Sequence, residues 1–222
     1  MKTNSFKIAR TALLLGSACL ALGATSLLAE GAASGGMSVP PPGLRSGLYL
    51  ATDAGLNLAD DLAVSGGSVS LSPGVRWDFS MGYAIKLADN LTLAPEVECG
   101  IIYNALDNAS AGHRSASASG SFWQVPLMAN VVLNWQFYPH WVLYGGGGAG
   151  LDYNTLSVDS VNGYGIYMTG SESDFAWQGM AGIKYVFGSS ELGVGWKYLA
   201  VQPSGLQTVG NNAFMLSYTV HF

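Results

Sequence analysis

From Ser46 to the end of the chain, apolar side chains recur at every second position, which is the period of a β-strand. The clearest run covers residues 75–86, where one face is wholly apolar and the other is charged or small: Val75, Trp77, Phe79, Met81, Tyr83 and Ile85 against Arg76, Asp78, Ser80, Gly82, Ala84 and Lys86. A helix would mix these two sets, whereas a strand separates them. The pattern therefore predicts strands with one apolar and one polar face.

The composition indicates what surrounds the apolar face. Charged residues make up 10% of the chain and hydrophobic residues 49%, whereas an ordinary soluble domain carries about 25% charged residues. After residue 30, no apolar run reaches the ~18–20 residues that a membrane-spanning helix needs. Because only helices and closed barrels satisfy every backbone polar group inside lipid, we expect an all-β transmembrane barrel.

The alternation predicts an eight-stranded antiparallel up-and-down barrel, with strands at 47–58, 75–86, 91–104, 121–137, 141–154, 174–187, 191–201 and 212–222. Short turns are expected at 88–90, 138–140 and 188–190, and long loops at 59–71, 105–120, 156–173 and 202–211. Outer-membrane barrels have short periplasmic turns and long extracellular loops. We therefore expect both chain ends on the periplasmic side.

The interior of an eight-stranded barrel is only just wide enough for side chains. All six tryptophans lie on the apolar face, so this face should point outward into lipid. Three aromatic pairs on successive strands are each 12 residues apart: Trp123 and Trp135, Trp141 and Tyr153, and Phe175 and Phe187. At ~3.3 Å per residue and a tilt of about 40°, this spacing spans ~30 Å, close to that of the aromatic girdles that flank the lipid band.

The inward face should then hold a network of charges in the lumen, formed by Asp53, Arg76, Asp78, Lys86, Glu96, Glu98, Asp152, Asp174, Lys184, Glu191 and Lys197. A buried charge without a partner is costly. We expect Arg76 to meet acids on the first and third strands, and Lys86 or Lys197 to lie lower in the lumen. The main interpretation is a plug of salt bridges. The alternative is a gated pore that prefers cations, because acids outnumber bases.

The N-terminus is predicted to be a cleavable signal peptide over residues 1–29. Lys2, Lys7 and Arg10 form a basic region, residues 11–28 are largely apolar, and Ala29 is a small residue suited to cleavage. The alternatives are a retained membrane anchor or a lipoprotein site at Cys19. Gly16 and Gly23 interrupt the apolar stretch and no basic stop follows it, which argues against the anchor. Gly16 also stands where a lipoprotein signal has Leu, which argues against the lipoprotein site.

Residues 30–46 contain three consecutive prolines and scattered glycine, and we interpret them as a flexible leader. The barrel domain then covers 47–222. Without the signal peptide, the chain has six Lys and Arg residues and 14 Asp and Glu residues, which gives a formal net charge of −8. This acidity argues against nucleic acid as a partner. Cys99 would be the one remaining cysteine, so an internal disulfide is excluded.

Several segments resemble the small outer-membrane β-barrel domain shared by opacity-type surface antigens and OmpA/OmpX-like barrels. The resemblance covers about 46–222, and its segments are VPLMANVVLNWQF (125–137), WVLYGGGGAGLDY (141–153), SDFAWQGMAGIKYVFG (173–188), LGVGWKYL (192–199) and FMLSYTVHF (214–222). Each is degenerate, and their order and spacing carry the resemblance. It implies location in the bacterial outer membrane, with lipids and lipopolysaccharide as surroundings. It also implies that Tyr218 and Phe222 belong to a C-terminal signal read by the barrel-assembly machinery.

Catalytic and metal-binding patterns are weak in this sequence. Barrel enzymes acting on lipid A need a His near Ser or Glu at the outer rim. His140 and His221 are predicted on the periplasmic side, and His113 lies in a long loop beside Arg114 and Ser115. We therefore expect no enzyme activity, no cofactor and no metal site.

The function that the sequence favours is a structural, surface-exposed barrel with a side-chain-filled lumen, whose long loops contact an extracellular ligand or surface. A small cation-preferring channel is the alternative, motivated by the polar lumen. A lipid A-modifying enzyme is the third hypothesis.

Overall fold

The alternating segments form ten strands in the computed structural model, which describes residues 43–64, 67–111, 114–202 and 207–222. In chain order they are β1 (Gly47–Ala59), β2 (Leu62–Val64), β3 (Gly67–Leu71), β4 (Gly74–Ala88), β5 (Leu91–Ala111), β6 (Arg114–Tyr138), β7 (Trp141–Val161), β8 (Tyr164–Phe187), β9 (Ser190–Gln202) and β10 (Val209–His221). Within the described ranges, no helix is long and apolar enough to cross a membrane. The predicted signal peptide and most of the leader lie outside the described residues, so both stay predictions.

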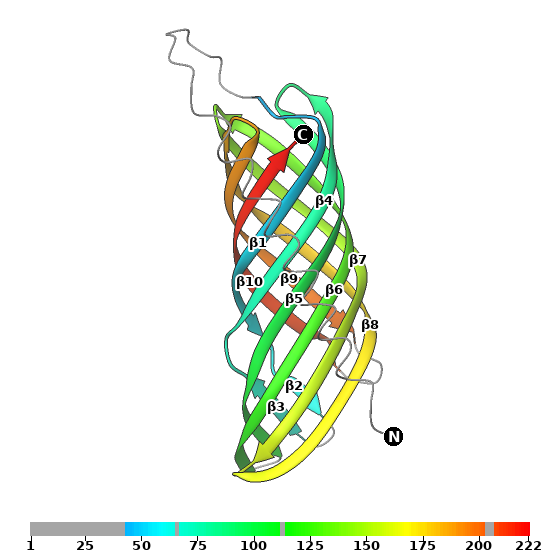
Figure 1. The fold of residues 1–222 in the computed structure, drawn as a ribbon, viewed down its shortest axis with the longest axis vertical. Coiled ribbons are helices and arrows are strands. Elements are labelled where there is room, and N and C mark those ends of the chain that lie inside the picture. Colours follow the sequence, from blue (N-terminus) through cyan, green and yellow to red (C-terminus); the bar gives the residue numbers. More distant parts are fainter. Residues whose placement is uncertain (1–42, 65–66, 112–113, 203–206) are drawn as a thin grey trace. The chain divides into compact units, whose positions relative to one another are not determined.

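Eight of these strands close into a ring in which every strand is antiparallel to its neighbours (Figure 1). The first and last strands of the ring make the closure, because β1 pairs with β10 from Tyr49↔His221 to Ala59↔Asn211. β2 and β3 are not members of the ring. They form a hairpin that pairs with β5. The predicted eight-stranded barrel is therefore confirmed.

Short turns and the C-terminus lie at one end of the barrel (Figure 1). Asp89–Asn90 joins β4 to β5, Pro139–His140 joins β6 to β7, and Gly188–Ser189 joins β8 to β9. His140 (φ 68°) and Gly188 (φ 59°) adopt the left-handed conformation that such tight turns need. By the layout of outer-membrane barrels this end is periplasmic, and the opposite end is extracellular.

The extracellular connections differ from the prediction, because most of 105–120 and 156–173 is strand and not loop. β5 pairs with β6 as far as Ala111↔Arg114, and β7 pairs with β8 as far as Val161↔Tyr164. The β7–β8 hairpin turns at Asn162–Gly163, with φ values of 51° and 77°. Backbone pairing does not depend on apolar side chains, so these Ser- and Gly-rich segments continue the ladder after the hydrophobic alternation has ended.

The apolar face of the strands points outward toward lipid, as predicted. All six tryptophans are exposed on the outer surface, with exposed fractions between 39% for Trp77 and 46% for Trp135. The six aromatic residues spaced 12 apart are also exposed. Their inward-facing neighbours, such as Gln124, Val142 and Ala176, are fully buried. The barrel thus presents an apolar belt to the membrane and keeps its polar side chains in the lumen.

Candidate functional site

The lumen contains alternating apolar and polar layers of side chains along its length. The periplasmic half holds an apolar layer formed by Tyr49, Ala84, Ala94, Val132 and Met180. A charged layer follows at mid-height. Beyond it come a second apolar layer, formed by Ile102, Met128, Ala176, Leu199 and Val201, and then a layer of carboxylates and amides.

Glycines on neighbouring strands make room for the polar side chains. A Cβ at Gly100 on β5 would collide with the Asp78 carboxylate, and a Cβ at Gly148 on β7 would collide with Oδ1 of Asn130. The sequence analysis did not predict which side chains these glycines accommodate. Glycine is required at both positions because a second side chain would occupy the same part of a narrow lumen.

The central charged layer, which we define as Asp53, Arg76, Asp78, Glu98 and Lys197, joins four strands of the ring. Arg76 bonds Asp78 at 2.8 Å and Glu98 at 3.1 Å. Lys197 Nζ lies 2.7 Å from Asp53, 2.8 Å from Asp78 and 2.9 Å from Glu98. Two cations therefore face three carboxylates in a buried cluster.

Amide and hydroxyl groups extend this layer to two more strands and toward the periplasm. Gln178 on β8 accepts a bond from Arg76 (2.9 Å) and donates to Glu98 (3.1 Å) and to Asn130 on β6 (2.8 Å). Asn130 in turn donates to Glu96 (3.0 Å), which also accepts a bond from the Tyr49 hydroxyl (2.7 Å). The network thus crosses the whole lumen.

The central layer closes the lumen in this structure. The side chains of Arg76, Asp78 and Glu98 have no exposed surface, and that of Lys197 is 4% exposed. The Asp53 side chain is 12% exposed, so water reaches the layer from that side only. At mid-height the lumen is thus filled by paired side chains.

Asp53, Asp78 and Glu98 bring carboxylate oxygens within 4.8 Å of one another, as in a metal site. However, the Lys197 ammonium already contacts all three groups. The chain itself therefore supplies the cation of this cluster, because an ammonium group stands where a metal cation would bind.

A second charged group lies in the periplasmic half of the lumen. Lys184 pairs with Glu191 at 3.1 Å, and His221 Nε2 lies 3.0 Å from the other Glu191 oxygen. The Lys184 ammonium also lies 5.0 Å from the centre of the Tyr144 ring. This group lies close to the periplasmic mouth, because His221 is the last residue of β10.

Three expected placements in the network need correction. Arg76 meets the acid of the third ring strand, Glu98, but Asp53 on the first strand pairs with Lys197 instead. Lys197 lies at mid-height and not lower in the lumen. Lys86 lies outside the lumen network, since its side chain is 46% exposed and pairs with Asp89 three residues away. The strand carrying Lys86 reaches the periplasmic turn there, so its end is open to water.

The outer polar layer contains acids held mainly by amides. Asp152 and Asp174 lie directly opposite each other on β7 and β8. Gln124 donates to Asp152 at 3.1 Å, and Asn154 donates to Asp174 at 2.8 Å. No ion pair involves Asp152 among the described residues. Asp152 therefore lacks the cationic partners that the carboxylates of the central layer have.

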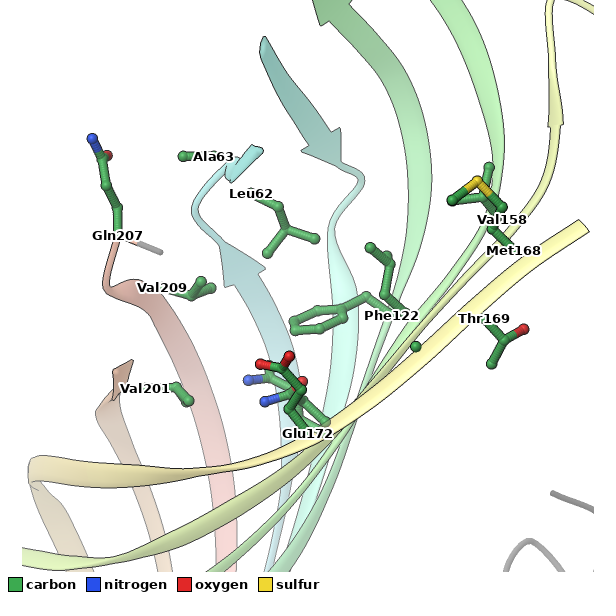
Figure 2. A pocket seen from close by; sticks show the side chains of 14 residues that line it. Leu62, Ala63, Phe122, Val158, Met168, Thr169, Glu172, Val201, Gln207 and Val209 are labelled. Carbon is green, nitrogen blue, oxygen red and sulfur yellow. The ribbon is translucent and has the colours of Figure 1, made fainter. Parts of the chain in front are cut away.

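A cavity of about 350 Å³ opens above this outer layer at the extracellular end (Figure 2). Its walls are mostly apolar and include Leu62, Phe122, Leu156, Met168 and Val209. The sequence analysis missed this cavity. The available signal was the large apolar residues at inward positions, Phe122 and Leu156, near the extracellular ends of their strands.

The histidines do not form a catalytic group at the outer rim within the described ranges. His140 lies in a periplasmic turn, where Nδ1 is 2.8 Å from the Val186 carbonyl oxygen. His221 pairs with Glu191 near the periplasmic mouth. His113 lies outside the described residues.

The family model for the outer membrane protein beta-barrel domain matches residues 17–222 of the chain. Among solved structures, the chain is similar to Neisserial surface protein A at 22% identity and a TM-score of 0.52, covering 80% of this chain and 98% of that one. It is also similar to OprG of Pseudomonas aeruginosa at 12% identity and a TM-score of 0.52, covering 81% and 98%. A comparison with curated protein sequences found no match.

The two structural likenesses establish a shared fold, and the family match covers the whole barrel. The resemblance inferred from the strand segments is therefore confirmed. A closed eight-stranded ring, an outer belt of tryptophan and a match across the barrel lead to one conclusion: the chain belongs to the outer membrane protein beta-barrel domain family and resides in the bacterial outer membrane.

Proposed function

We propose that this protein is a closed, structural barrel that presents its extracellular hairpins as a contact surface. The observation that carries the proposal is the contrast between a sealed lumen and an exposed hairpin tip. Tyr164, Tyr167 and Met168 near the β7–β8 turn are 76%, 88% and 65% exposed. Exposed aromatic side chains at the end of a rigid hairpin are suited to binding another surface.

Attachment of cells tests the contact function. Bacteria that display the protein should adhere to surfaces coated with fibronectin, laminin or collagen, and the double change Tyr164→Ser and Tyr167→Ser should reduce adhesion to at least one coating several-fold. Tyr138→Ser is the matched control, because Tyr138 is 64% exposed but lies beside the periplasmic turn. Equal adhesion of cells with and without the protein to all three coatings would contradict the proposal.

Conductance across a planar lipid bilayer tests the closed lumen. The central layer fills the lumen with buried, paired charges, so the purified protein should give no stable conductance steps in potassium chloride. Cation-selective steps that disappear on changing Glu96 and Glu98 to glutamine would support the channel hypothesis and overturn the plug.

The lack of an enzymatic role is part of the same proposal. It is supported by the positions of His140 and His221, both at the periplasmic end. The mass spectrum of lipid A should be the same in cells with and without the protein, and a changed acylation pattern would reveal an enzyme.

The C-terminal strand is proposed as the signal for the barrel-assembly machinery. Phe222 is 72% exposed, and its backbone N–H donates to the Leu48 carbonyl oxygen at 3.0 Å. Phe222→Ala should lower the amount of barrel assembled in cells, while the purified barrel loses less than about 0.5 kcal/mol of stability because little surface is buried there. Unchanged assembly in cells would contradict this role.

A further inference from the structure

The extracellular cavity is a half-open pocket lined by strands from separate parts of the chain. Leu62 on β2 and Val209 on β10 form one side of it, and Phe122 on β6 lies between them and the far wall (Figure 2). Val158 and Met168 of the β7–β8 hairpin form the far wall. Ligand pockets in proteins have volumes of about 300–1,000 Å³ and mainly apolar linings, so the cavity of about 350 Å³ is large enough for one small molecule.

Two oxygen-bearing groups at this cavity can receive a cationic donor, the Glu172 carboxylate and the Gln124 amide oxygen. Glu172 directs its carboxylate toward the space beneath Phe122, as Figure 2 shows, and no ion pair of Glu172 occurs among the described residues. Gln124 also lines the cavity and is fully buried. Its Nε2 donates to Asp152, while its Oε1 has no hydrogen-bond partner among the described residues.

The charges around the cavity favour a cation. None of its 14 lining residues is Lys, Arg or His. The outer polar layer below it adds Asp152 and Asp174, which lie opposite each other. An anionic ligand would therefore be repelled, while a cation would gain an attractive field in a cleft with low-dielectric walls.

We propose that this cavity binds a small amphipathic amine, with an alkyl chain among the apolar side chains and the ammonium group at Glu172. Burial of the ligand's alkyl chain contributes affinity but does not orient the ligand, because this contribution depends only on the apolar area removed from water. The carboxylate supplies orientation and selects the cation. We expect the carboxylate to contribute roughly tenfold in affinity.

Methionine methyl groups give a readout that separates pocket binding from partitioning into lipid. The experiment records ¹³C-methyl-methionine NMR spectra of the barrel in lipid nanodiscs. Met168 reports on the cavity that it lines, whereas Met81, which is 46% exposed, reports on the lipid-facing surface. Decylamine is the probe, and decanoate and decanol have the same chain length with an anionic and a neutral head. We expect a saturable shift of Met168 with decylamine, about tenfold tighter than with decanoate, and a non-saturating response of Met81.

Gly170 allows the cavity to be filled without disturbing the fold. It lines the cavity, and a Cβ there would meet nothing within 4 Å. Gly170→Phe should therefore abolish the saturable Met168 shift. Ser171→Phe is the matched control, because Ser171 lies next in the strand, is exposed, and bonds Thr155 on the outer surface. It should bind decylamine like the unchanged protein.

Glu172→Gln tests the role of the carboxylate charge, and this test does not require Gly170→Phe to fold. It should weaken decylamine binding about tenfold and leave decanol unchanged. Asp159→Asn is its control, since Asp159 is an exposed acid of the same hairpin that does not line the cavity. A Met168 response that fails to saturate, or that persists in Gly170→Phe, would overturn the site. Equal affinity for decylamine and decanoate would overturn the amine as its ligand class.

Discussion

Two pairs of aspartates lie directly opposite each other on neighbouring strands, and the two pairs have different partners. Asp53 and Asp78 face each other across β1 and β4, and Lys197 contacts both. Asp152 and Asp174 face each other across β7 and β8, where Gln124 and Asn154 donate to them. Like charges opposite each other are destabilising unless a cation lies between them.

The difference separates the barrel into a region built for closure and a region built for contact. The central layer combines charges from four strands into a sealed cluster, and it lies at the middle of the membrane-spanning part. The outer layer places Asp152, which has no ion pair among the described residues, beneath an apolar cavity. Carboxylates paired with cations join strands together, whereas a carboxylate without an ion pair is available to attract a cation from outside.

Lys197→Met should produce the largest effect. It leaves Asp53, Asp78 and Glu98 with Arg76 alone, and removing one partner from a buried ion-pair network costs about 3–5 kcal/mol. Urea titration of the refolded barrel, followed by tryptophan fluorescence and by heat-dependent migration on gels, measures the loss. Lys86→Met is the control and should cost less than about 1 kcal/mol, because its pair with Asp89 is exposed. Equal losses in the two variants would contradict the closure role of the central layer.

Combining Lys197→Met with an Asp→Asn change should distinguish the two aspartate pairs. Asp53→Asn should recover about 0.5–3 kcal/mol of the lost stability, since it removes a carboxylate that has lost its ammonium partner. Asp152→Asn should be additive with Lys197→Met, because no bond joins the two residues. The same urea titrations, arranged as two double-mutant cycles, give both coupling energies. Recovery of similar size in both cycles would show that the layers are not independent.

Asp152→Asn alone should produce the smallest effect. The asparagine keeps an oxygen that can accept the Gln124 bond, and the variant removes a buried charge that has no ion pair among the described residues. We expect a change within about 1 kcal/mol, toward higher stability. A loss as large as that of Lys197→Met would mean that this carboxylate belongs to a neutralised network after all.

The sequence analysis was most successful where the information is local. The size of the tryptophans on the apolar face, Trp77 and Trp135 among them, predicted which face meets lipid, and these residues lie on the outer surface. It also selected the inward charges, and all except Lys86 lie on the lumen side. Lys86 was misplaced because the period of two continues to the end of β4, while exposure to water there depends on where the barrel ends.

The strand ends and the cavity could not be predicted in the same way. Ser- and Gly-rich segments such as 105–120 lack hydrophobic alternation, so their extended pairing leaves no apolar pattern in the sequence. The cavity needs Leu62, Phe122 and Val209 to converge from three strands. No window of sequence contains all three.

By itself, the sequence determined the strand period, the number of ring strands, the lipid-facing belt and the residue types in the lumen. These follow from the alternating directions of side chains along a strand, which is a local property of the backbone. Only the tertiary structure decided that Lys197 meets Asp53, 144 positions away, and that Asp152 has no such cationic partner in the part of the chain that the structure describes. The register between distant strands and the reach of side chains across a narrow lumen determine which charges meet, and neither is encoded in any single strand.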